Sequence, residues 1–253
     1  MNKARWIIVS YLILVTISNV AYGALSTEFV GKSACVACHT EQVGRWVGSH
    51  HYLAMQEVAE KTVLGDFNDA IISHYGVAST FYRDGERFMV RTEDAEGKLA
   101  DLEVKYVFGV HPLQQYLIEF PGGRLQALSL AWDTRTKDAG GQRWFHLYPD
   151  EKIPHDDELH WTKPSQNWNS MCAECHSTNL QKNYDPDSKS FSTTWAEIDV
   201  SCEACHGPGA KHVSWAEKKP GWEEYQSDKG LSVLLDERQG VTWSMGQETG
   251  SAR

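Results

Sequence analysis

All six cysteines of the 253-residue chain stand in three motifs of the pattern Cys-x-x-Cys-His. The motifs are Cys35-Val36-Ala37-Cys38-His39, Cys172-Ala173-Glu174-Cys175-His176 and Cys202-Glu203-Ala204-Cys205-His206. Two thiols at this spacing can add to the two vinyl groups on one edge of a porphyrin, and the adjacent imidazole can then reach the iron. The pattern therefore predicts three covalently attached haem c groups, with the three motif histidines as proximal iron ligands.

Zinc binding and disulfide formation are the alternative uses of such thiol pairs. Two Cys-x-x-Cys pairs could form a Cys₄ zinc site, but the third pair would then have no partner. Zinc also does not explain the histidine after every pair. With 11 histidines in 253 residues, three such coincidences have a chance of roughly one in ten thousand, which favours haem attachment.

The eight remaining histidines are candidates for the second axial position of each iron. Their number favours bis-histidine ligation over a His/Met pair. His212 follows His206 across the turn Gly207-Pro208-Gly209 and could reach a neighbouring iron. His51 follows the first motif on a predicted helix, and His160 precedes the second motif. We therefore predict His51, His160 and His212 as distal ligands.

The first 23 residues have the order of regions of a secretory signal peptide. Lys3 and Arg5 precede the apolar stretch 6–20, and Ala21-Tyr22-Gly23 gives a cleavage site with small residues. An uncleaved membrane anchor is the alternative, although the stretch is shorter than the ~20 residues of a spanning helix. We expect a bacterial protein exported to the periplasm, with no membrane span after cleavage.

The charge balance bears on the partners. With 24 Lys and Arg against 34 Asp and Glu, the net charge is −10, which argues against nucleic-acid binding. We expect redox partner proteins that dock through a basic patch. Association with a membrane-bound electron donor stays open.

The predicted fold is mixed and mainly α, with little regular structure around the haems and a β-rich insert between the first and second motifs. Residues 24–75 form a first haem-binding segment, with helix-like apolar spacing over residues 40–61. Residues 76–150 form the insert, in which 81–90 indicate two strands around the turn Asp84-Gly85. Residues 151–217 hold the other two motifs, only 25 residues apart, so that their haems are expected to be neighbours. Residues 218–253 form a polar tail.

The chain resembles exported multihaem cytochromes of the c-552/c-554 type, a tetrahaem group. The resemblance rests on the three motifs and their flanks, namely Gly31-Lys32-Ser33-Ala34, Trp46-x-x-Ser49-x-His51-x-x-Ala54-Met55, Met171, Ser177-Thr178-Asn179 and Gly207-Pro208-Gly209-x-x-His212. It implies that His51 rather than His50 is a distal ligand, and that His51 and His212 each reach a haem other than that of the nearest motif.

Larger bacterial proteins that join this haem domain to tetratricopeptide repeats are also similar. The similar segments are Pro112-Leu113-Gln114-Gln115-Tyr116-Leu117, residues 141–149 and His160-Trp161-Thr162. Such domains usually have a fourth Cys-x-x-Cys-His motif. We therefore expect this sequence to be a fragment or a shortened relative of a longer chain, in which a fourth haem would be present.

The sequence favours an electron-transfer cytochrome that passes single electrons between redox partners. The alternative is a multihaem oxidoreductase whose open-site haem acts on a small nitrogen or sulfur compound such as hydroxylamine or nitrite. A haem-based sensor or assembly subunit is a third class, which rests on the similarity to repeat proteins alone.

Overall fold

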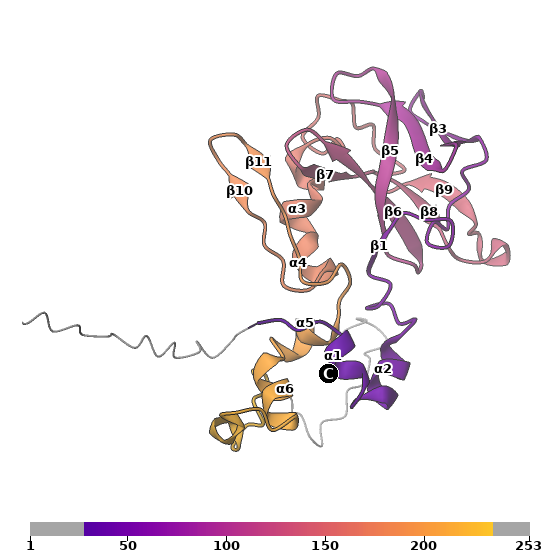
Figure 1. Ribbon diagram of the computed structural model, residues 1–253. Coiled ribbons are helices and arrows are strands. Elements are labelled where there is room, and N and C mark those ends of the chain that lie inside the picture. Colours follow the sequence, from indigo (N-terminus) through magenta and orange to yellow (C-terminus); the bar gives the residue numbers. More distant parts are fainter. Residues whose placement is uncertain (1–27, 235–253) are drawn as a thin grey trace, which may run out of the picture.

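The computed structural model describes residues 28–234, and its largest element is an antiparallel sheet of nine strands (Figure 1). The strands are β1 (Met55–Glu57), β2 (Ala70–His74), β3 (Val77–Asp84), β4 (Arg87–Glu93), β5 (Leu99–Phe108), β6 (Leu113–Phe120), β7 (Arg124–Ala127), β8 (Leu130–Asp133) and β9 (Arg143–His146). A separate hairpin consists of β10 (Tyr184–Asp185) and β11 (Ser190–Phe191).

The helices are short, and most lie beside the three motifs. The α-helices are α1 (Ser33–Val36), α2 (Thr40–Trp46), α3 (Trp168–Met171), α4 (Ala173–His176), α5 (Cys202–His206) and α6 (Ala210–Ala216). The 3₁₀ helices are η1 (Lys137–Ala139), η2 (Pro164–Gln166) and η3 (Trp222–Tyr225). In Figure 1, α1, α2, α5 and α6 gather below the sheet, whereas α3 and α4 lie beside it.

The main path through the sheet is β2-β3-β4-β5-β6-β8-β9, with β1 added to β5 and β7 added to β6. The two ends of this path approach each other, because the His74 ring on β2 stacks on the His146 ring on β9 with centroids 3.7 Å apart. The sheet is therefore a nearly closed barrel.

Local sequence explains the hairpins of the sheet. The predicted pair of strands over residues 81–90 is confirmed, since Phe81 pairs with Val90 and Asp84 with Arg87. Gly85 has a φ of 59° in the connecting turn, a conformation that suits glycine. Strands β6 and β7 are likewise separated by Pro121-Gly122-Gly123.

Two apolar clusters support the sheet. In the first, Phe67 makes edge-to-face contacts with Phe81, Phe88 and Tyr116, and Trp144 stacks on Phe81 with centroids 3.4 Å apart. The second cluster joins the sheet to the second motif. It contains Met55, Phe108, Leu117, Leu125, Ala127, Trp168 and Ala173. Burial of these side chains fixes α3 and α4 on the barrel.

The expectation of a mainly α fold is wrong, because strands outnumber helices and span residues 55–146. Helix-like spacing over residues 40–61 is the main source of the error. The helix α2 ends at Trp46, Val47 is extended, and Gly48 has a φ of 79°. Met55 then pairs with Phe108 on β5. Tertiary strand pairing therefore outweighs a local apolar pattern.

Within residues 28–234, no helix has the length and apolar character needed to cross a membrane. The predicted signal peptide, residues 1–23, lies outside the described residues, as does the part of the polar tail after residue 234.

Candidate haem-binding sites

Each of the three motifs contains one short turn of helix. In the first motif, the amide of His39 donates to the Cys35 carbonyl at 3.0 Å. The second and third motifs contain α4 and α5, which end at His176 and His206. A helical turn brings residues three and four apart to one face, so both cysteines and the histidine of a motif can meet one ligand. All six thiols are free, and in each motif the second cysteine is exposed.

The first and third motifs adjoin. Burial, followed by the neighbouring Cys202 thiol, raises the pKa of Cys35 to about 11. Trp46, which ends α2, donates from Nε1 to the carbonyl of Val200 at 3.0 Å. The 25-residue spacing favoured the second and third motifs as neighbours, whereas side-chain contacts join the first and third.

Glu203 holds these two motifs together from inside the third one. Its buried carboxylate accepts hydrogen bonds from the backbone amides of Val30 (2.9 Å), Gly31 (2.8 Å) and Gly209 (2.7 Å). Nearby, the Lys32 ammonium lies 2.7 Å from the Asp199 carboxylate. Burial raises the pKa of Asp199, although the hydrogen bond from Lys32 opposes this.

Two histidine rings from distant parts of the chain face each other at the first motif. The ring centroids of His39 and His212 are 6.1 Å apart, with an interplanar angle of 31°. Rings this close could both hold the iron of one haem, with His39 as the motif ligand and His212 as the second. His212 Nδ1 lies 2.9 Å from the Lys229 carbonyl. When Nδ1 donates its hydrogen to that carbonyl, Nε2 of His212 carries no hydrogen and can bind a metal.

His176 is held in the same way. Its Nδ1 lies 3.0 Å from the carbonyl of Ala54, and its ring meets the edge of Phe108 with centroids 5.4 Å apart. A backbone carbonyl at Nδ1 fixes the ring orientation and leaves Nε2 to bind a metal. His206 is exposed at the end of α5.

The other two predicted distal ligands, His51 and His160, are placed differently from His212. His51 is exposed in a turn after α2, rather than on a helix. Its neighbour His50 faces His111, with ring centroids 6.2 Å apart and an interplanar angle of 35°. No spacing in the sequence indicates this pair, because His111 lies in the distant connection between β5 and β6.

His160 lies within the sheet region. Its ring is buried, with Nδ1 2.9 Å from the Thr162 hydroxyl and Nε2 3.9 Å from the Glu93 carboxylate. Burial lowers the pKa of His160 to about 4. Together with Glu93 and Trp161, the ring lines a cavity of the barrel.

The described side chains fit haem c better than a bare metal ion. Across residues 28–234, no three His, Cys, Asp or Glu side chains converge as a metal-ion site would require. The Cys₄ zinc site allowed by the spacing is therefore not formed by these residues. Paired free thiols, an adjacent histidine and Nδ1-anchored imidazoles suit a macrocycle attached through its edge and ligated from its faces. These features define a c-type cytochrome.

Comparison with protein families agrees with this class. Residues 34–70 and 141–207 match the family described as cytochrome c554 and c-prime, and through these segments the chain belongs to that family. The family implies covalently bound haem c and a haem-based role in electron transfer. Residues 71–140, which form most of the barrel, lie between the matched segments. No curated protein and no solved structure matches the chain.

Proposed function

We propose that this chain is an exported periplasmic cytochrome that carries three haem c groups and passes single electrons between redox partner proteins. The observation that carries the proposal is the threefold occurrence of two free thiols and a histidine on one turn of backbone. Bound haem supplies reversible one-electron chemistry at its iron. The chain's own residues attach, ligate and orient it.

The motif histidines His39, His176 and His206 are the proximal ligands of this proposal. His212 faces His39 and is the distal ligand of the first haem, while His51 is retained as a distal ligand of another haem. The hydrogen bonds that His176 and His212 make to backbone carbonyls keep Nε2 of each ring available. We leave His160 out of this ligand set, because its Nε2 lies 3.9 Å from the Glu93 carboxylate in a barrel cavity whose described lining includes no motif cysteine or motif histidine.

The partners follow from charge and compartment. A net charge of −10 favours docking on a basic surface. Export through the signal sequence at residues 1–23 would bring the chain to the periplasm, where thiols can be joined to haem before they oxidise to disulfides. A membrane-bound electron donor is compatible with this location.

Counting haems tests the proposal directly. The full chain is expressed with its signal sequence and a haem c maturation system, and its intact mass is measured. We expect three haems, and one fewer in each double variant Cys35→Ser/Cys38→Ser, Cys172→Ser/Cys175→Ser and Cys202→Ser/Cys205→Ser. Met171→Leu, next to the second motif, is the control and keeps all three. A chain that binds zinc or matures without haem would overturn the proposal.

The redox step needs a second measurement on the same holoprotein. Potentiometric titration followed by visible absorbance is expected to show reversible one-electron steps and low-spin spectra. A haem that is high-spin and binds cyanide in the unaltered protein would favour the alternative function, an oxidoreductase that acts on a small nitrogen or sulfur compound.

A further inference from the structure

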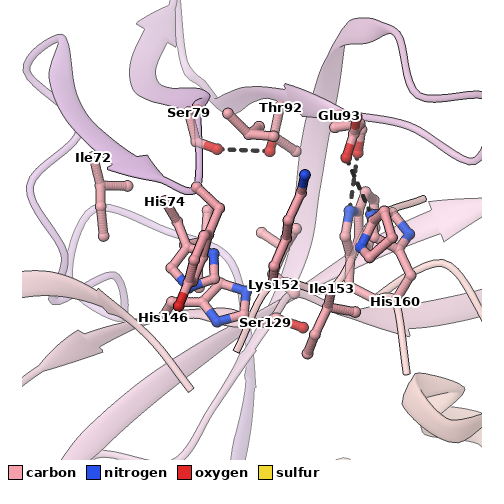
Figure 2. Close-up of a pocket in the computed structure, with 17 residues that line it drawn as sticks. Ile72, His74, Ser79, Thr92, Glu93, Ser129, His146, Lys152, Ile153 and His160 are labelled. Atoms are coloured by element: carbon pink, nitrogen blue, oxygen red, sulfur yellow. Dashed lines mark hydrogen bonds and ion pairs between the residues drawn. The ribbon is translucent and has the colours of Figure 1, made fainter. Parts of the chain in front are cut away.

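The barrel contains a cavity that the haem motifs do not use. Its volume is about 370 Å³, and it lies where β2 and β9 approach each other (Figure 2). Its walls come from β2, β3, β4, β8, β9 and the segment 152–161. No motif cysteine or motif histidine is among the described residues that line it. The volume lies at the lower end of the range of small-molecule sites, about 300 to 1,000 Å³.

Part of the wall is apolar. Leu128 and Leu130 are buried beside β8, and Trp161 is buried on the opposite segment. The Trp161 ring is fixed in place, since its Nε1 donates to the Glu93 carbonyl at 2.9 Å. This part of the cavity suits the hydrocarbon or aromatic body of a small molecule.

A second part of the wall offers hydrogen-bond donors. The hydroxyls of Ser79 and Thr92 are buried and lie 2.6 Å apart. One of them donates to the other, so that the second proton is left for a ligand. In Figure 2 the ammonium of Lys152 lies on the side of the cavity that holds Thr92. Among the described residues no carboxylate pairs with Lys152, although nine other Lys, Arg or His groups form the ion pairs of this part of the chain.

Glu93 is the one carboxylate among the described residues that line the cavity, and it forms no ion pair with Lys152. The Glu93 carboxylate faces the His160 ring at 3.9 Å. His74 and His146 are stacked, and each places a ring nitrogen 3.1 Å from the Tyr148 carbonyl. Burial, together with the adjacent His74, lowers the pKa of His146 to about 4, so its ring is neutral near pH 7. The cavity thus combines an apolar wall with the Lys152 ammonium, which forms no ion pair among the described residues, and one hydroxyl donor from Ser79 or Thr92.

We propose that this cavity binds a small organic carboxylate, with its carboxylate at Lys152, Ser79 and Thr92 and its apolar body against Leu128, Leu130 and Trp161. The site combines Ser79, Thr92, Leu128 and Leu130, which lie between the two segments of the cytochrome family match, with Lys152 and Trp161 from the matched segment 141–207. It would add ligand recognition to the haem segments.

Calorimetric titration of the full haem-loaded protein tests the proposal, with benzoate and hexanoate as probes. Benzamide and hexanamide have the same bodies without the charge, and inorganic sulfate has the charge without the body. We expect both carboxylates to bind at least about tenfold more tightly than the amides or sulfate, because a hydrogen-bonded charge in a partly buried site is strong. The haem absorbance is followed in parallel and is expected to stay unchanged, which separates the cavity from an iron site.

Two variants locate the binding. Lys152→Gln and Ser79→Ala are each expected to weaken benzoate binding, the first by about tenfold. Lys137→Gln removes an exposed lysine of η1 that does not line the cavity, and it is expected to bind as the unaltered protein does. The proposal is overturned if no carboxylate binds at millimolar concentration, if amides or sulfate bind equally well, or if Lys152→Gln has no effect.

Discussion

His39 and His212 come from opposite ends of the described chain, yet their rings face each other with centroids 6.1 Å apart. His39 belongs to the first motif, and His212 lies on α6, just after the third. The contact of Cys35 with Cys202 and the hydrogen bonds of Glu203 bring these segments together. The two rings are therefore close enough for both to ligate one iron, as the proposed function requires.

His212→Ala is expected to remove the distal ligand of one haem. In the ferric holoprotein, one haem of the set then changes from low-spin to high-spin and gains the ability to bind cyanide, while the others are unaltered. Electron paramagnetic resonance and cyanide titration measure this. His155→Ala, in the loop after β9, is the matched control and keeps the original spectrum. A wholly low-spin His212→Ala protein would show that another group ligates this iron.

The sequence predicted the local features of this site and that His212 could reach a neighbouring iron, but it did not predict that His50 would lie beside His111. Cys35, Cys38 and His39 lie within one turn of chain, so their spacing alone specifies what they can hold. His50 and His111 are brought together only by the pairing of β1 with β5 and the loop that follows β5. No spacing rule contains that information.

For the fold as well, local features could be predicted from the sequence and long-range contacts could not. Hairpins such as β3–β4 were predictable, because alternation and an Asp-Gly turn act over a few residues. Closure of the barrel was not, since it depends on contacts between β2 and β9, such as the stack of His74 on His146. His160 is predicted as an iron ligand from its place before the second motif, whereas its burial beside Glu93 in the barrel depends on contacts distant in sequence.

Glu203→Gln is expected to weaken the joint between the first and third motifs. A glutamine has one acceptor oxygen and a donating amide, so it cannot replace a carboxylate that accepts three backbone N–H bonds. The expected loss in free energy of unfolding is about 1.5–3 kcal/mol. Denaturant unfolding of the holoprotein followed by circular dichroism measures it.

Glu174→Gln provides the control for this change, since Glu174 occupies the neighbouring position of the second motif and is exposed. Its expected effect lies within about 0.5 kcal/mol. If both variants lost the same free energy of unfolding, the hydrogen bonds of Glu203 would not be what holds the first and third motifs together.

The stacked pair His74–His146 predicts acid sensitivity of the barrel. Burial lowers the pKa of His146 to about 4, from 6.5. The unfolded chain therefore takes up a proton at this residue before the folded one does. The associated stability is fully present above pH 6.5 and is lost as the pH falls toward 4, by at most about 1.4 kcal/mol per pH unit. The other ionisable groups lining the cavity are His74, Tyr75, Lys152, Glu93 and His160, of which His160 also has a pKa lowered to about 4 by burial and so contributes in the same pH range.

His146→Gln is expected to flatten this pH dependence. The free energy of unfolding is measured in denaturant at several values between pH 4 and 7, and the slope of the variant is compared with that of the unaltered protein. His155→Gln, outside the stacked pair, is expected to keep the original slope. An unchanged slope in His146→Gln would mean that His146 is not the group that takes up the proton.

Gly65 approaches the aromatic core so closely that a methyl group is expected to be destabilising. A Cβ at this position would lie 2.5 Å from the Tyr116 hydroxyl and 2.7 Å from the Trp144 ring. The Gly65 amide also donates to that hydroxyl at 3.0 Å, so a shift of the backbone would break the bond. Gly65→Ala is expected to lower the free energy of unfolding by about 1–3 kcal/mol.

Two further experiments test whether the close contact between position 65 and the aromatic core causes the loss of stability. Gly44→Ala, in α2, has no atom within 4 Å of the new Cβ and is expected to be neutral or stabilising, because alanine favours a helix. In a Tyr116→Phe background the nearest atom is gone, so Gly65→Ala is expected to cost less than in the unaltered protein. If the cost is the same in both backgrounds, the Tyr116 hydroxyl is not what excludes a side chain at position 65.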